Sequence, residues 1–158
     1  MTRDDAIEKV HALIDTYHAM PHPAELRLLY EVRRDLTAAY STLTRHVKQA
    51  YGSKALTYVY RKYAVAREIA KAQEDDAGKV KSSRRPFNAL EVRTEALDHV
   101  LQRRKEEVEA EAQWEELEAV LKAADRALGA MSQELADGRR ERDYQNYLES
   151  LQKKEQTQ

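Results

Sequence analysis

Apolar residues recur every three or four positions along most of this chain, a spacing typical of amphipathic α-helices. Residues 1–20 are predicted to form the first helix. Its apolar face consists of Ile7, Val10, Ile14 and Tyr17. Thr2 or Asp4 can cap its N-terminus, since both side chains accept hydrogen bonds from free backbone amides. Pro21 and Pro23 are expected to end it, because proline lacks an amide hydrogen and fixes its own backbone.

Residues 24–137 are predicted to form a helical core. Its first part carries a heptad seam made of Leu26, Leu29, Leu36, Tyr40, Leu43, Val47 and Ala50. The pair Gly52-Ser53 interrupts this seam and is expected to form a kink or a short turn. A second apolar run follows at Leu56, Val59, Tyr63, Ala66 and Ala70. We expect this run to be the buried face of a helix over residues 54–76.

The rest of the core is predicted to be a loop and a long helix. Residues 77–86 have no apolar period and are expected to form a mobile loop. A long helix is expected over residues 87–137, with Asn88 as its N-cap residue and Gly138 just beyond its C-terminus. Residues 139–158 are expected to form a short amphipathic helix and a disordered tail.

The composition favours an all-α fold. Charged residues make up 35% of the chain, and strong helix formers dominate it, while no stretch shows the alternation of a β-strand. So much charge leaves little apolar area per residue for a compact globule. We therefore predict an elongated helical hairpin or bundle with coiled-coil-like packing and one long C-terminal helix.

The chain contains no cysteine, which excludes disulfides and thiolate metal sites and favours a reducing compartment. No apolar run approaches the length that spans a membrane, and the N-terminus lacks the apolar core of a signal peptide. We therefore expect a cytoplasmic protein without a membrane partner.

Positive charge is concentrated between Leu43 and Pro86. This stretch has eleven Lys and Arg residues but only four Asp and Glu residues, whereas the whole chain has a net charge of −1. Four tyrosines are interleaved with the basic residues. Cations that neutralise phosphates and aromatic rings that stack on bases are what a single nucleic-acid strand requires. The stretch is therefore our main candidate for a binding surface.

The predicted nucleic-acid contacts fall into two groups. One lies on the basic helix and comprises Lys54, Tyr60, Arg61, Lys62, Arg67 and Lys71. The other lies in the loop and comprises Lys79, Lys81, Arg84 and Arg85. No base-reading motif accompanies them, so we expect non-specific or single-strand binding that weakens as salt rises. The competing interpretation is a solvated helix surface followed by a solubilising linker, because charge runs on helices usually face water.

No residue pattern indicates catalysis. The four glycines are too far apart for a phosphate-binding loop, and no nucleophile–base constellation is present. His18 and His22 have the spacing of zinc ligands on a helix, but the neighbouring prolines disfavour a regular helix there. Glutamates crowd residues 106–118, where we expect them to face solvent or another subunit's basic helix. We predict a protein that is not an enzyme and uses no cofactor or metal.

An apolar seam in the long helix indicates self-association. Trp114 opens this seam, which continues with Leu117, Leu121, Leu128, Met131 and Leu135. On a helix this charged, such a seam needs a partner surface. The helix that begins near residue 24 supplies one within the chain, and further copies of the chain supply another. We therefore predict a homo-oligomer that is held together by this seam.

The layout resembles the phage UvsY recombination mediators over roughly residues 44–142. The similar features are a basic helix with Tyr60, Lys62, Tyr63 and Arg67, a polar loop over residues 78–86, and a tryptophan-bearing segment. That segment comprises Val108, Trp114, Leu117 and Leu121, followed by the run from Ala127 to Met131. The chain differs from that family in its additional N-terminal helix and in lacking a strongly basic overall balance.

The resemblance implies a phage-encoded, ring-like oligomer that binds single-stranded DNA. Such mediators help a RecA-type recombinase to replace single-strand-binding protein. Weak contacts in each subunit would add up in a ring, because the subunits present many basic faces at high effective concentration. The alternative is a helical protein–protein adaptor or inhibitor of phage type, whose basic helix contacts an acidic protein instead of nucleic acid.

Overall fold

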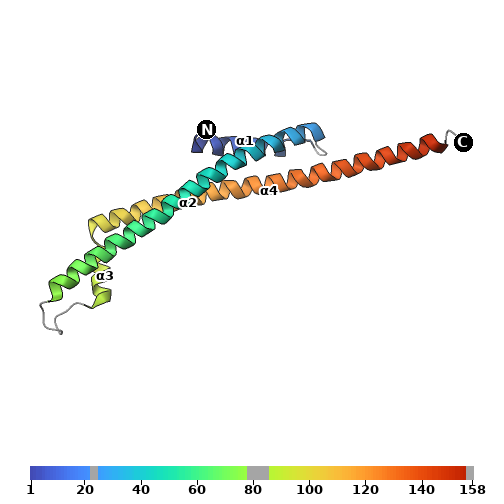
Figure 1. Cartoon of the computed structure of the whole chain (residues 1–158). Coiled ribbons are helices and arrows are strands. Elements are labelled where there is room, and N and C mark those ends of the chain that lie inside the picture. The colour runs from blue at the N-terminus through green and yellow to red at the C-terminus, as the bar shows by residue number, and fades with distance from the viewer. Residues whose placement is uncertain (22–24, 78–85, 156–158) are drawn as a thin grey trace. The chain divides into compact units, whose positions relative to one another are not determined.

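A computed structural model describes residues 1–21, 25–77 and 86–155, and these residues form α-helices and no β-strand (Figure 1). The helices are α1 (Arg3–His18), α2 (Leu26–Ala77), α3 (Phe87–Glu95) and α4 (Asp98–Glu155). The predictions of an all-α fold and of a long C-terminal helix are thus confirmed. The predicted loop lies almost entirely outside the described residues, as do His22 and Pro23.

The chain divides into two compact units. Unit 1 consists of residues 1–46 and 117–158, and unit 2 consists of residues 47–116. Helices α2 and α4 each contribute to both units, whereas α1 belongs to unit 1 and α3 to unit 2.

The core of unit 1 is built from three helical segments. The start of α2 buries Leu29, Leu36 and Leu43 completely, as the seven-residue spacing of these leucines predicts. Helix α4 contributes another row of buried residues: Leu117, Val120, Ala124, Ala127, Met131 and Leu135. Helix α1 adds Ala6, Val10 and Tyr17. Burial of these apolar side chains is the main force that holds the unit together.

Polar contacts cap the first turn of α1 and join its last turn to α4. The side chain of Thr2 accepts a hydrogen bond from the amide of Asp5, and the Asp5 carboxylate accepts one from the amide of Thr2. The bond from the Thr2 amide is the main cause that lowers the pKa of Asp5. Since this pKa is depressed by folding, the cap stabilises α1 near neutral pH and loses this contribution as the pH falls through the lowered value. At the other end of α1, the Tyr17 hydroxyl donates to Glu134, 3.2 Å away on α4.

The core of unit 2 differs from the predicted one. The buried cluster consists of Val65, Ile69 and Val100, with Ala64 and Leu97 packed against it. The predicted apolar face of this part of α2 is instead exposed: Leu56 and Val59 are each 55% exposed and Tyr63 is 68% exposed. The prediction that these residues form the buried face was therefore wrong.

The unbroken course of α2 explains this error. Gly52 lies inside the helix, where a single glycine costs about 1 kcal/mol but does not stop the hydrogen-bond ladder. The inward face that begins at Leu29 therefore continues at the same three–four spacing beyond the glycine. There it reaches half-buried positions that are mostly polar: Lys54, Thr57, Arg61, Ala64 and Glu68. Leu56, Val59 and Tyr63, by contrast, lie on exposed sides of the helix.

The ends of the helices differ from the predicted ones at three further places. Residues 87–137 do not form one helix, because α3 ends at Glu95 and α4 starts at Asp98. Pro86, not Asn88, occupies the N-cap position of α3. Gly138 does not end a helix, because α4 continues through it to Glu155. An added Cβ at Gly138 would lie 2.5 Å from a methyl carbon of Leu26. The absence of a side chain at Gly138 therefore leaves room for the Leu26 side chain of α2.

The last turns of α4 carry little packing. Among residues 139–152, every side chain that the structure describes is exposed except Leu148, which is half-buried. This segment therefore continues α4 and is not the separate short helix that we predicted. No helix among the described residues combines the length and the apolarity needed to cross a membrane.

Leu36→Ala tests the leucine seam of unit 1. Leu36 is fully buried, so its truncation should lower the free energy of unfolding by about 2–5 kcal/mol. Leu28 lies on the same helix and is 42% exposed, so Leu28→Ala should cost less than about 1 kcal/mol. Urea denaturation followed by circular dichroism measures both values. Equal losses in the two variants would contradict the assigned seam.

Candidate nucleic-acid interface

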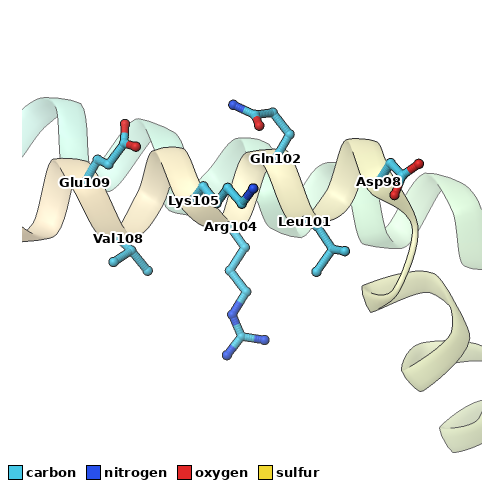
Figure 2. A pocket seen from close by; sticks show the side chains of 7 residues that line it. All are labelled: Asp98, Leu101, Gln102, Arg104, Lys105, Val108 and Glu109. Atoms are coloured by element: carbon cyan, nitrogen blue, oxygen red, sulfur yellow. The ribbon is translucent and has the colours of Figure 1, made fainter.

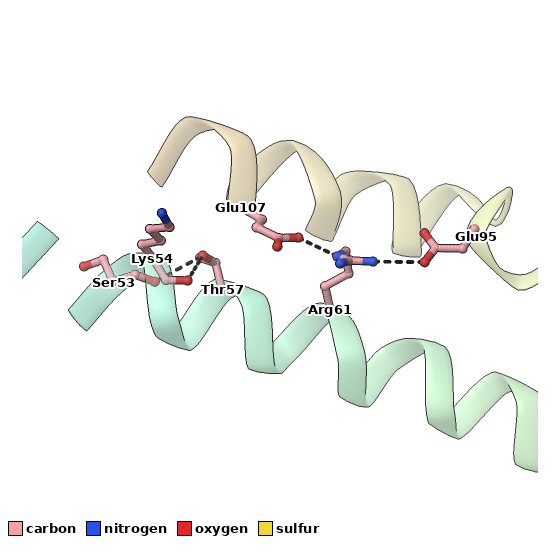
Figure 3. Close-up of polar contacts among 6 residues, drawn as sticks. All are labelled: Ser53, Lys54, Thr57, Arg61, Glu95 and Glu107. Atoms are coloured by element: carbon pink, nitrogen blue, oxygen red, sulfur yellow. Dashed lines mark hydrogen bonds and ion pairs between the residues drawn. The ribbon is translucent and has the colours of Figure 1, made fainter. Parts of the chain in front are cut away.

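Arg61 lies at the centre of an internal ion cluster of unit 2 (Figure 3). Its Nε donates to Glu107 of α4, and its Nη1 donates to Glu95 of α3 over 2.9 Å. The three side chains are only 15%, 18% and 26% exposed, for Arg61, Glu107 and Glu95 respectively. One guanidinium group thus connects α2 with both helices that follow it in this unit.

The surroundings of Arg61 keep it charged. Burial lowers the pKa of Arg61 and is the largest single influence on it. The hydrogen bond to Glu107 and the charges of Glu107 and Glu95 together outweigh burial and raise this pKa above its ordinary value. The described contacts of Arg61 thus lie within unit 2, while its predicted contact with nucleic acid stays a prediction.

Lys54 is also used internally. Its Nζ lies 2.7 Å from Glu111 and 4.0 Å from the ring centroid of Trp114, which combines an ion pair with a cation–π contact. The ring of Tyr51 meets the same Trp114 edge-on, with 6.1 Å between centroids. Lys54 is therefore another predicted contact residue that serves the packing of α2 on α4 within unit 2.

The predicted oligomerisation seam lies inside the chain. In unit 1, Leu117, Met131 and Leu135 are buried, and Leu121 and Leu128 are half-buried. In unit 2, Trp114 is half-buried against Lys54 and Tyr51. These side chains make contacts within the chain, and the prediction that the seam drives oligomerisation stays a prediction.

A second group of predicted residues is accessible and lines a shallow pocket of unit 2. Tyr60, Arg67 and Lys71 project from one side of α2, and Tyr63 borders them. Helix α4 contributes two residues that the sequence analysis did not include, His99 and Arg103. The guanidinium carbon of Arg103 lies 6.0 Å from the ring centroid of Tyr60, where it can be attracted by the ring. We call these residues the basic-aromatic pocket.

One acid, Glu68, reduces the positive charge of the basic-aromatic pocket. The ammonium group of Lys71 donates to Glu68 over 2.7 Å, and Nε2 of His99 lies 3.7 Å from the same oxygen. The hydrogen bond from Lys71 is the main cause that lowers the pKa of Glu68. Glu68 therefore stays ionised at neutral pH and offsets Lys71. Arg103 donates to Glu106 over 2.9 Å, which leaves Arg67 as the net positive charge.

The remaining candidates do not join this pocket. Lys62 is exposed on another side of α2, with its Nζ 5.8 Å from the ring centroid of Tyr58. The four loop candidates lie outside the described residues: Lys79, Lys81, Arg84 and Arg85. Arg103 was missed because it lies 36 residues beyond Arg67 in the sequence, where no local pattern relates the two. The described residues also contain no cluster of three metal-ligating side chains.

Comparison with known proteins does not identify a relative: no protein-family model, curated protein or solved structure matches the chain. The functional argument therefore depends on the residues themselves.

Arg61→Ala separates a stabilising role from a binding role. The substitution leaves Glu95 and Glu107 without their shared cation, so we expect a loss of about 2 kcal/mol, less than the ~3–5 kcal/mol of fully buried pairs. Lys62→Ala at the exposed neighbouring position should change stability by less than about 0.5 kcal/mol. Urea denaturation provides the comparison. An Arg61→Ala variant as stable as wild type would show that the cluster does not hold unit 2 together.

Proposed function

We propose that the basic-aromatic pocket of unit 2 binds a single strand of nucleic acid, and that the protein is a non-catalytic accessory factor in recombination or replication. The observation that carries the proposal is the placement of Arg67 and Arg103, from two different helices, beside the exposed ring of Tyr60. Cations and an aromatic face within one hollow match the two repeating parts of a strand, its phosphates and its bases.

The chemistry of the pocket suits binding without base recognition. Arginine can hold a phosphate with two parallel hydrogen bonds, and Arg67 and Arg103 both lie at the surface. The ring of Tyr60 is 52% exposed, so a base can stack on it without any rearrangement of the core. No asparagine or glutamine lines the pocket to read a base edge. The expected binding is therefore non-specific in sequence.

The wider role follows from the resemblance to the UvsY mediators. In such a role, an oligomer holds single-stranded DNA while a RecA-type recombinase replaces single-strand-binding protein. Two or three cations in each subunit give only weak binding, so several subunits must act together on one strand. The proposal therefore requires a homo-oligomer as well as a basic surface.

A helical protein–protein adaptor is the second candidate function. It is favoured by the exposed apolar side chains of α2, because Leu56, Val59 and Tyr63 have no partner in the buried cluster of unit 2. This candidate predicts protein binding that persists when the cations of the basic-aromatic pocket are removed.

A triple substitution tests nucleic-acid binding. Arg67→Ala/Lys71→Ala/Arg103→Ala should weaken binding to a fluorescent oligonucleotide at least about tenfold at about 50 mM salt. The slope of log K against log salt should also fall in size by about 2, because each phosphate contact on a single strand contributes about 0.7. Fluorescence anisotropy at several salt concentrations measures both quantities.

A matched variant controls for net charge. Arg34→Ala/Arg126→Ala/Arg140→Ala removes three exposed cations from unit 1 and should leave binding nearly unchanged. Equal losses in the two triple variants would indicate a diffuse charge effect and contradict the assigned pocket. Wild-type protein that shows no salt-sensitive binding would exclude the proposed function.

Glu68→Gln tests the same pocket with a substitution that should tighten binding. The substitution removes the one negative charge of the basic-aromatic pocket and releases Lys71 from its ion pair. Binding should therefore tighten about threefold or more, and the salt slope should become steeper by about 0.7. Weaker binding by Glu68→Gln in the same anisotropy titration would argue against a polyanion in this pocket.

A further inference from the structure

We infer that a second copy of this chain docks on unit 2, with the exposed stripe of α2 in one copy packed antiparallel against the exposed stripe of α4 in the other. This contact uses surfaces other than the Trp114 seam, whose side chains pack within the chain. It does not depend on the proposed nucleic-acid binding.

The first stripe is the outer face of α2. Its members recur at alternating spacings of four and three residues, they are all exposed, and they comprise Val59, Tyr63, Ala66, Ala70, Gln73 and Ala77. The stripe lies beside Val65 and Ile69, which form the core of unit 2, and its members Val59 and Tyr63 also line hollows that α4 of the same unit borders. Heptad spacing on an outer face, with two large apolar side chains and three alanines, is the pattern of a helix that packs against another helix.

The second stripe is the outer face of α4. Leu101, Lys105, Val108, Ala112 and Glu115 recur at the same alternating spacing and are all exposed. Leu101 and Val108 point in the same direction from α4, as Figure 2 shows, and are 40% and 58% exposed. They line a shallow hollow that is bordered by Asp98 and Glu109. This face of α4 is exposed in unit 2.

The charges beside the stripes select an antiparallel orientation. Along α2 the exposed charges run from basic to acidic, from Lys62 and Arg67 to Glu74 and Asp75. Along α4 they run in the same order, from Arg103–Lys105 to the glutamates at 109 and 115. Two helices that both run from basic to acidic place opposite charges together only when they are antiparallel. A parallel contact between two α2 stripes would instead bring the cations of both copies together.

The spacing of the two stripes fits one register in this orientation. When Ala66 of one copy faces Ala112 of the other, Ala70 faces Val108 and Tyr63 faces Glu115. In the same register Ala77 faces Leu101, and Arg67 lies near Glu109. The small alanine layers allow the helices to approach closely, and the Tyr63 hydroxyl can donate to the carboxylate of Glu115. The contact is heterologous, because each copy uses different faces on its two sides, so it can repeat and close into a ring.

Substitutions at two facing alanines test both the contact and its register. Ala66→Glu and Ala112→Lys each place a charge in an alanine layer, and both positions are exposed, so the fold of one chain should survive. Wild type should sediment as a multiple of 18.3 kDa at micromolar concentration without nucleic acid, and each variant should sediment as a monomer. A mixture of the two variants should reassemble. At one kind of interface, the carboxylate introduced at position 66 faces the ammonium group introduced at position 112. At the other kind, both facing positions keep their wild-type alanines.

The controls make each outcome decisive. Ala89→Glu changes an exposed alanine of α3 outside both stripes and should assemble like wild type. Circular dichroism should show equal helicity in all variants. A wild type that stays monomeric, variants that still assemble, or a mixture that stays monomeric would each overturn the inference. Because Arg67 is left unchanged and no nucleic acid is present, these results do not depend on whether the basic-aromatic pocket binds a strand.

Discussion

The ion cluster around Arg61 determines the structure of unit 2. Its guanidinium group binds Glu107 of α4 and Glu95 at the end of α3, so one side chain holds three helices. The apolar cluster beside it is small, consisting of Val65, Ile69 and Val100 with two partly buried neighbours. With so little apolar area, the unit depends on a charge that must remain paired, since a lone carboxylate at this depth is costly.

The continuity of α2 produces both surfaces on which the proposals rest. Because the helix passes through Gly52 without a break, its inward face beyond that point consists mostly of polar residues. The apolar residues are therefore left outside, at Val59 and Tyr63, while Tyr60 and Arg67 project beside them toward the start of α4. A surface for another helix and a surface for a polyanion thus lie next to each other on one helix. Occupancy of one can influence the other through Arg67, which borders both.

Part of the fold and part of the site could be predicted from local patterns. The leucines at 29, 36 and 43 were predicted to be core residues because heptad spacing and burial agree when a partner helix covers the face. Thr2, which caps α1, was one of the two capping residues predicted for the same kind of local reason. For the site, local charge and tyrosine content pointed to Tyr60, Arg67 and Lys71, which the structure places around one exposed pocket. They could not separate these residues from Arg61, which has the same chemistry but faces inward.

The sequence alone determined that this protein is helical, where its first core seam lies and which stretch concentrates positive charge. These properties depend on residue spacing and composition, which are local. Only the tertiary structure decided that Arg61 and Lys54 are held by internal partners, that the Trp114 seam is used within the chain, and that Arg103 joins the basic-aromatic pocket. Each of these results depends on which side of one helix meets another, and the phase of a helix is set by packing across long sequence separations.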